Sequence, residues 1–303
     1  MNNILKKEGP DFICIGLPKA GTTWIYSMLC KHPQVNLPDK EIRYFWEKAR
    51  LGQNGFFKRM ISSNWHYRSK RNLYKKRFLS HIRDSIRFQL DINRLVWDIR
   101  YAVLPRSDKW YLSLFNNNYV NGDISPIYHM LNETEVDHIN KLLPHTKIII
   151  AIRNQVEREW SRAKMILCKN RNRDLDDVSE GEYIEYFNEM LEKGLNDYVG
   201  LIEKWKKYFG DDKIFVVFYD ELKEKPAFLY QKICEFLEIN IPDDLETSVI
   251  RTRINKGISR DIPTKLEQYL YRMYEKTMTE QINYFKDLDY PKIWLNKFTE
   301  KYG

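Results

Sequence analysis

Three short runs of the chain are almost wholly apolar and rich in Ile, Val and Phe: FICIG at 12–16, KIIIAI at 147–152 and KIFVVF at 213–218. Such runs are typical of strands in a parallel sheet that is covered on both faces. Between them lie long stretches with apolar residues at helical spacing, and the clearest example spans 178–209. Its apolar positions are Tyr183, Phe187, Leu191, Leu195, Tyr198, Ile202 and Trp205. The alternation of strand and helix predicts an α/β fold, a doubly wound sheet with central parallel strands flanked by helices.

The segment 46–118 interrupts this alternation with mixed basic and aromatic residues, most densely at 58–78. It predicts a helical insertion within a single domain that spans 1–303. The basic stretch 58–83 has two interpretations, a cap or polyanion-binding surface beside the active site, or the solvated face of amphipathic helices. We favour the solvated face.

The formal net charge of +8 favours an anionic partner, but charge alone does not choose among a nucleotide, an acidic substrate, a nucleic acid and a membrane surface. Four cysteines, Cys14, Cys30, Cys168 and Cys234, are scattered without the spacing of a metal site. They indicate a reducing compartment and no structural metal. Since the chain offers no signal-peptide pattern and no apolar stretch of membrane-spanning length, we expect a cytoplasmic protein.

A loop with phosphate-binding character follows the first predicted strand. It reads GLPKAGTTW at 16–24 and runs directly into an apolar helical pattern. Glycines let the backbone approach an anion, and the first N–H groups and the dipole of the helix favour negative charge there. The usual nucleotide-triphosphatase loop has a lysine after its second glycine, but here Thr22 takes that position and the positive charge sits within the loop, at Lys19.

The string PKAGTTW closely resembles the 5′-phosphosulfate loop of the sulfotransferase superfamily, which has a P-loop-like fold and uses 3′-phosphoadenosine 5′-phosphosulfate (PAPS) as sulfuryl donor. The resemblance is to the bacterial and heparan-sulfate-modifying branch. It implies that Lys19 stabilises the leaving oxygen of the donor. It also implies donor contacts from the whole loop segment, Lys19, Ala20, Gly21, Thr22, Thr23 and Trp24.

Further matches occur along the chain in the order of the family. Arg153 after the second apolar run, with Ser161 eight residues later, resembles the pair that binds the 3′-phosphate, although Gln155 stands where relatives often have Pro. Tyr219 occupies the position that the resemblance places near the adenine. Farther on, Lys256, Gly257 and Arg260 resemble the basic loop that closes over the 3′-phosphate, with Arg260 the weaker match.

The acceptor side carries three candidates for the base that removes the acceptor's proton. KEIRYF at 40–45 resembles the Lys-Glu-x-x-Phe-Phe segment of the heparan-sulfate branch, which makes Glu41 the first candidate. GDISPIY at 122–128 resembles a Gly-Glu-x-Ser-Pro-x-Tyr segment beside the acceptor pocket, so Asp123 is a second base, an acceptor-orienting group, or a carboxylate tied into a turn. His129 is the third candidate. Because the sulfuryl group carries less charge than a phosphoryl group, no metal is expected.

Two other functions fit the loop less well. A kinase or nucleotide-triphosphatase would need the lysine after Gly21 that is missing here, and a non-enzymatic anion-binding module would leave Lys19, Arg153 and Ser161 unexplained. We therefore expect no nucleic-acid partner and no membrane span. The acceptor offers a hydroxyl or an amine and is expected to be a small metabolite, with a carbohydrate or polysaccharide as the alternative; oligomeric state stays open.

Overall fold

The computed structural model describes residues 8–51, 92–115, 118–194, 196–242 and 260–302. Within them, one parallel sheet of five strands has the order β2-β3-β1-β4-β5. The strands are β1 (Phe12–Cys14), β2 (Val35–Asn36), β3 (Val120–Ile124), β4 (Lys147–Ile152) and β5 (Ile214–Phe218). The three apolar runs predicted as strands are β1, β4 and β5, and they are neighbours in the sheet. The predicted parallel α/β fold is confirmed.

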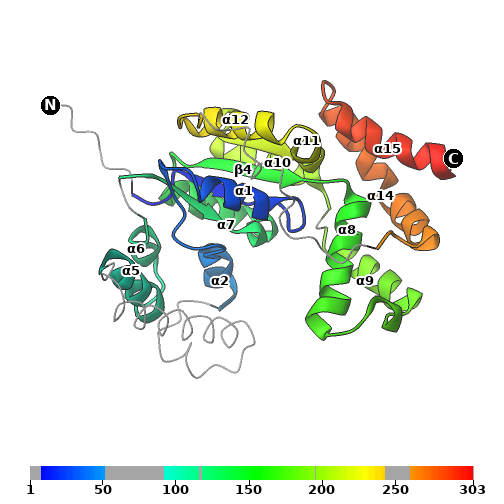
Figure 1. The fold of residues 1–303 in the computed structure, drawn as a ribbon, viewed down its shortest axis with the longest axis horizontal. Helices are drawn as coiled ribbons and strands as arrows, with labels where there is room; N and C mark the ends of the chain where they lie inside the picture. The colour runs from blue at the N-terminus through cyan, green and yellow to red at the C-terminus, as the bar shows by residue number, and fades with distance from the viewer. Residues whose placement is uncertain (1–7, 52–91, 116–117, 195, 243–259, 303) are drawn as a thin grey trace.

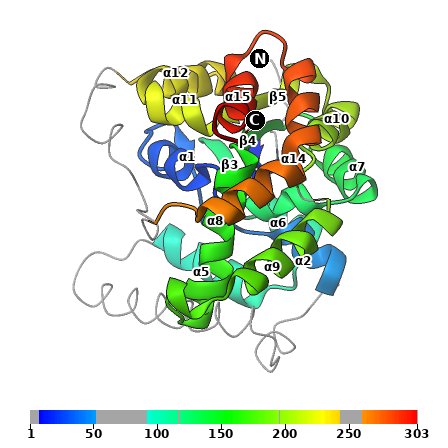
Figure 2. The ribbon, with the colours of Figure 1, turned by 90° about the vertical axis from the view of Figure 1, so that its right-hand side faces the viewer.

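Helices cover both faces of this sheet. Figure 2 shows α1 (Thr22–Leu29), α11 (Tyr219–Glu224) and α12 (Pro226–Leu237) on one side, and α7 (Glu133–Leu142) and α10 (Tyr198–Phe209) on the other. Trp24 of α1 meets Tyr230 of α12 edge to face, with ring centroids 6.3 Å apart. Apolar side chains from both layers join the strands in one continuous core, as the wholly apolar strand sequences require.

A second apolar cluster lies beside the sheet, where α8 (Gln155–Ala163) packs with α9 (Glu180–Glu192), α14 (Thr264–Tyr284) and α15 (Asp289–Tyr302) (Figure 1). A π-helical turn at Lys164–Cys168 continues α8, and short 3₁₀ turns follow at Lys169–Arg171 and Leu175–Asp177. Two more 3₁₀ turns are Pro126–Met130 after β3 and Asp211–Lys213 before β5. Through this cluster α8 packs against α9 and α14 in a core that is separate from the core around the sheet.

The helical stretch expected over 178–209 forms two helices, α9 and α10 (Tyr198–Phe209), with a break between them that the apolar spacing does not show. After α9 the chain turns at Gly194, which has a φ of 61°, and Asp197 caps α10 by accepting a hydrogen bond from the N–H of Gly200. The reason for the break is tertiary, because buried Asn196 accepts a hydrogen bond from Gln155 through its carbonyl oxygen (2.7 Å) and donates through Nδ2 to the hydroxyl of Tyr274 (2.6 Å). This turn therefore ties α8 to α14.

Part of the predicted insertion 46–118 is described, and that part is mainly helical. It contains the end of α2 (Tyr44–Leu51), α5 (Ile92–Val103) and α6 (Asp108–Leu112), which lie together at one end of the molecule in Figure 1. The basic stretch 58–83 lies outside the described residues. In the described part of the chain, no helix combines the length and hydropathy needed to span a membrane, and all four cysteines are free thiols.

The close approach of β1 to β4 gives a first prediction. A Cβ on Gly16 would lie 2.1 Å from the backbone nitrogen of Ala151, so the strands would have to separate. We expect Gly16→Ala to lower the free energy of unfolding by about 1–3 kcal/mol or more, measured by urea denaturation. Gly181→Ala is the control, because the nearest atom to its added Cβ is 3.9 Å away. Equal stability of the two variants would contradict the prediction.

Candidate active site

The loop after β1 is shaped by continued pairing with β4. The N–H groups of Ile15 and Leu17 donate to the carbonyl oxygens of Ile149 (3.0 Å) and Ala151 (2.9 Å). The chain then turns sharply, with Lys19 at a φ of 72° and Gly21 at 92°, and α1 begins at Thr22. A left-handed lysine is uncommon and costs conformational energy, which points to a functional constraint on this loop. The first amides of α1 are thereby directed to the edge where the strands end.

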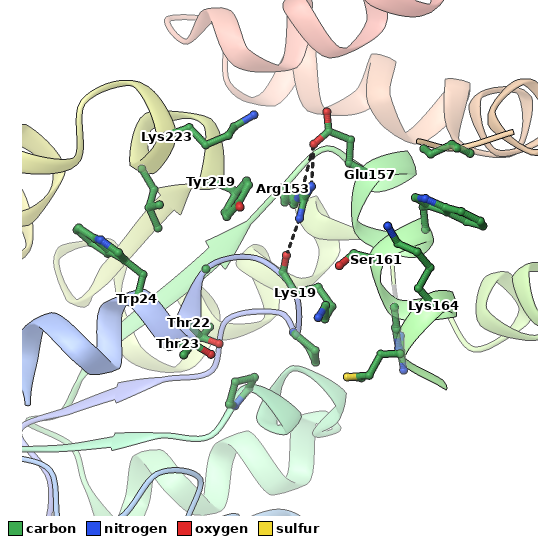
Figure 3. A pocket seen from close by; sticks show the side chains of 18 of the residues that line it. Lys19, Thr22, Thr23, Trp24, Arg153, Glu157, Ser161, Lys164, Tyr219 and Lys223 are labelled. Carbon is green, nitrogen blue, oxygen red and sulfur yellow. Dashed lines mark hydrogen bonds and ion pairs between the residues drawn. The ribbon is translucent and has the colours of Figure 1, made fainter. Parts of the chain in front are cut away.

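A large cleft lies at this edge of the sheet, with a volume of about 2690 Å³. Ligand pockets usually measure roughly 300–1,000 Å³, so the cleft has room for a nucleotide and a second molecule. Its lining includes ten of the residues predicted from sequence, brought from five separate stretches of the chain: Lys19, Gly21, Thr22, Thr23, Trp24, Glu41, Arg153, Ser161, Tyr219 and Arg260. Figure 3 shows most of these side chains around one space. Ala20 is fully buried beneath the loop.

Arg153 links the second predicted anion site to the loop. It follows β4 directly, and its Nη1 donates to the carbonyl oxygen of Lys19 at 3.3 Å (Figure 3). Its guanidinium lies 4.3 Å from the ring centroid of Tyr219, at the end of β5, and pairs with Glu157 at 2.9 Å. The hydroxyl of Tyr198 donates to the Arg153 carbonyl oxygen at 2.8 Å and fixes the backbone. The guanidinium is therefore held at the cleft wall by neighbours on three elements.

The cleft concentrates positive charge around the loop. Burial lowers the pKa of Lys19, and the charges of Arg153 and Lys169 lower it further. Lys164 behaves in the same way, since burial and then Arg153 and Lys19 lower its pKa. Cations that depress each other's pKa are stabilised when an anion binds between them. In Figure 3, Lys19, Ser161 and Lys164 lie around the same part of the cleft.

Sequence reasoning missed Lys164 and Lys40. Lys164 follows Ser161 by three residues, a spacing that places both on one side of a helix, and this signal could have found it. Lys40 precedes Glu41, and its Nζ donates to Oγ1 of Thr23 at 2.9 Å, so it connects the predicted acceptor segment to the donor loop. Burial lowers the pKa of Lys40. The contact of Lys40 with Thr23 does not follow from the sequence, since the two residues belong to different elements.

The closing segment is described only in part. Lys256 and Gly257 lie outside the described residues. Arg260 pairs with Asp176 at 2.5 Å, and its carbonyl oxygen accepts hydrogen bonds from Trp160 (3.0 Å) and Lys164 (3.1 Å). The guanidinium of Arg260, a residue of the cleft lining, is thus engaged by Asp176.

Glu41 and Arg43 form a second strained turn at the cleft. Their φ angles are 65° and 59°, and both residues belong to the cleft lining. The Arg43 guanidinium pairs with the Glu41 carboxylate, and its Nε and Nη2 both donate to Oε2, the former at 2.7 Å. The carboxylate is therefore oriented by its neighbour. The turn itself is attached to β3, because the N–H of Glu41 donates to the carbonyl oxygen of Ile124 at 3.1 Å.

Asp123 lies elsewhere. It is fully buried in β3 and is not among the described residues that line the cleft. Its carboxylate accepts hydrogen bonds from the hydroxyls of Tyr111 (2.9 Å), Ser125 (2.6 Å) and Tyr128 (3.0 Å). In this position the Asp123 carboxylate does not reach the described cleft, so of the roles suggested by the sequence the geometry supports a carboxylate tied into a turn and not a contact with the acceptor.

His129 is also buried and does not line the described cleft. Its Nδ1 donates to the carbonyl oxygen of Pro126 at 2.6 Å. Burial, with the charge of Arg158, lowers the pKa of His129 to about 3. Of the three candidate bases, Glu41 is the one that lines the described cleft.

A glycine-bearing turn at the carboxyl edge of a parallel sheet, with Arg153 and a carboxylate at the same cleft, is the arrangement expected of an α/β enzyme that acts on an anionic nucleotide. The model of the sulfotransferase family matches residues 10–243. The chain belongs to this family, and the sulfotransferase class predicted from the loop is confirmed.

Individual relatives agree with this assignment. The bifunctional heparan sulfate N-deacetylase/N-sulfotransferase 1 of Caenorhabditis elegans is 23% identical over 265 residues, which cover 84% of this chain and 25% of that protein. The chain thus spans about a quarter of the length of this relative. A sulfotransferase from Alicyclobacillus acidocaldarius superposes with a TM-score of 0.60 at 16% identity, covering 94% of this chain and 98% of the other. The sulfotransferase domain of the Synechococcus PCC 7002 olefin synthase gives 0.54 at 17%, covering 91% and 97%.

The buried His129 predicts how stability depends on pH. Between its ordinary pKa of 6.5 and the folded value of about 3, the unfolded chain binds a proton that the folded protein excludes. Stability must therefore fall as pH decreases through this window, by roughly 1.4 kcal/mol per pH unit at most from this residue. We expect His129→Gln to show a shallower loss than the wild type in urea denaturation between pH 6.5 and 4.5. Parallel curves would contradict the prediction.

Proposed function

We propose that this protein transfers the sulfuryl group of PAPS to a hydroxyl or amine of an acceptor. The observation that supports this most directly is the meeting of Lys19, Arg153 and Lys164 at one cleft, where burial and the charge of Arg153 lower the pKa of both lysines. PAPS carries a 3′-phosphate and a 5′-phosphosulfate, and two separated anionic groups would offset this repulsion. The family of the chain implies the same donor.

We assign the 5′-phosphosulfate to the loop of Lys19 and the first amides of α1. Arg153 and Ser161, on the other side of the loop, are assigned to the 3′-phosphate, with Tyr219 near the adenine. Lys256, Gly257 and Arg260 remain proposed contacts of the same phosphate. These roles rest on the common cleft and on the distance of 3.3 Å between Arg153 and the Lys19 carbonyl.

In the proposed reaction the acceptor atom attacks sulfur while the bond from sulfur to the bridging oxygen of the 5′-phosphate breaks. Lys19 stabilises the negative charge on that oxygen, and Glu41 takes the proton of the acceptor. The products are the sulfated acceptor and adenosine 3′,5′-bisphosphate. Because Arg43 uses Oε2 of Glu41, we assign the proton to Oε1.

The acceptor is proposed to be a small metabolite, with a carbohydrate as the second candidate. The cleft volume exceeds that of a typical nucleotide site and leaves room for an acceptor beside the donor. The carbohydrate candidate is favoured by the name of the Caenorhabditis elegans relative, which acts on heparan sulfate. Free thiols at all four cysteines suit a reducing compartment, and we retain the cytoplasm as the proposed location.

Donor binding can be tested without knowing the acceptor. At about 100 times its dissociation constant, adenosine 3′,5′-bisphosphate is expected to add roughly 2.7 kcal/mol to folding stability, which raises Tm by a few degrees. ATP with Mg²⁺ at the same concentration should give a smaller shift. Arg153→Ala should remove most of the shift, whereas Arg171→Ala, an exposed arginine outside the described cleft lining, should retain it. No response of the wild type to the bisphosphate would overturn the proposed donor.

The role of Glu41 predicts a separation of turnover from binding. We expect Glu41→Gln to reduce turnover by about 10²-fold or more while the affinity for adenosine 3′,5′-bisphosphate is unchanged. Transfer of radiolabelled sulfate from PAPS would be measured to p-nitrophenol, to glucosamine and to an N-desulfated heparin oligosaccharide. Glu300→Gln, which changes an exposed residue of α15, is the control. Near-normal turnover of Glu41→Gln on the best acceptor would exclude it as the base.

A further inference from the structure

The buried carboxylate of Asp123 is the centre of a hydrogen-bond network beneath the cleft. Three hydroxyls donate to it, those of Tyr111 and Tyr128 to Oδ2 and that of Ser125 to Oδ1. Asp123 and Ser125 are both fully buried. Burial, together with the charge of Asp123, raises the pKa of both tyrosines, so their hydroxyls stay protonated as donors. The network fixes the direction of the Ser125 hydroxyl, which gives its proton to Asp123.

Because its proton is committed, the Ser125 oxygen is left as an acceptor, and it receives the backbone N–H of Arg43 at 3.0 Å. The backbone N–H of Ser125 donates to the carbonyl oxygen of Cys14 at 3.0 Å, at the end of β1. Ser125 therefore connects two segments: the strand that leads into the Lys19 loop and the turn that carries Glu41.

The turn from Lys40 to Arg43 has little regular structure of its own. Lys40 makes a parallel bridge to Ile124, and the N–H of Glu41 donates to the Ile124 carbonyl oxygen. Both Glu41 and Arg43 have left-handed backbones, a conformation that non-glycine residues adopt only where surrounding contacts enforce it. The contacts that enforce it here come from consecutive residues of one segment, Ile124 and Ser125.

We propose that Asp123 and Ser125 are positioning residues, which hold the turn of Glu41 and Arg43 at a fixed place relative to the Lys19 loop. Asp123 orients the Ser125 hydroxyl, Ser125 holds the Arg43 N–H, and the Glu41 carboxylate is thereby kept facing the cleft. Neither residue touches the substrate. The expected effect on turnover rests on the proposed function of Glu41. The coupling of Ser125 to the turn is independent of that function, since it rests on the hydrogen bond from the Arg43 N–H.

Ser125→Ala tests the proposal because it removes the acceptor of the Arg43 N–H with a loss of one oxygen atom. We expect the amides of 41–43 to exchange hydrogen about tenfold faster in a peptide that covers the turn, as expected for the loss of one buried hydrogen bond. Turnover of PAPS with the best acceptor should fall by roughly 10²-fold, the cost of a misplaced catalytic group. Affinity for adenosine 3′,5′-bisphosphate should be unchanged.

Thr146→Val is the matched control. It also removes one fully buried hydroxyl, which donates to the carbonyl oxygen of Pro10 at 2.7 Å, but at the opposite end of β4 from the cleft. We expect a similar loss of stability in urea denaturation, with exchange of 41–43 and turnover both at wild-type values. If the two variants lower turnover and speed exchange equally, general destabilisation explains the effect and the proposal is wrong.

Two further outcomes are decisive. Unchanged exchange of 41–43 in Ser125→Ala would overturn the positioning role, whatever happens to turnover. Faster exchange with undiminished turnover, in a protein that binds the bisphosphate, would confine Ser125 to a structural role and overturn the proposal in its catalytic part. Failure of the wild type to bind the bisphosphate would instead contradict the proposed function, and the exchange comparison would still report on the coupling.

Discussion

The backbone pairing of β1 with β4 is the constraint on which the arrangement of the cleft depends. Gly16 permits the contact, since a side chain there would meet the backbone of Ala151. The pairing continues past the end of β1, so the Lys19 loop emerges beside Arg153, the first residue after β4. Parallel strands end at one edge, and every segment that follows a strand there is brought to the same space. The proposed donor, with anionic groups at the 3′ and 5′ positions of one ribose, would need cationic groups from neighbouring segments in this way.

This edge brings several cations together, which raises the electrostatic free energy of the protein when no anion is bound. Burial and mutual repulsion lower the pKa of Lys19 and of Lys164, which means that their charged forms are destabilised in the protein without an anion. Arg153 is partly neutralised by Glu157, on the next turn of α8, and its guanidinium rests on the face of Tyr219. The same positive charges that repel each other in the protein without an anion therefore favour binding of an anion.

The strands could be predicted from sequence because burial on both faces of a parallel sheet leaves wholly apolar runs. β3 was harder to find, since Asn121, Gly122 and Asp123 break the apolar pattern, and the Asp123 carboxylate is satisfied by hydroxyls of Tyr111, Ser125 and Tyr128. The helical stretch 178–209 shows a second limit of the sequence pattern, which does not reveal where one helix ends and the next begins. Its apolar spacing is nearly continuous, but Asn196 serves α8 and α14, and this tertiary demand ends α9 before α10 begins. The periodicity of apolar residues indicates which face of a helix is buried. It does not indicate where a backbone group is hydrogen-bonded by a neighbouring element.

At the cleft, motif spacing predicted which side chains meet, but it could not predict the conformations that hold them. Within the described residues, five non-glycine residues have a positive φ, and four of them, Lys19, Glu41, Arg43 and Asn172, line the cleft. Strain that gathers at one site must be balanced by contacts from outside it. For Glu41 and Arg43 those contacts run through Ser125 to Asp123. A supporting role of this kind gives a reason for burying the Asp123 carboxylate, which does not line the described cleft. Of the roles that the sequence left open for Asp123, a carboxylate tied into a turn agrees best with these hydrogen bonds, and in our proposal it supports the turn of Glu41 and Arg43.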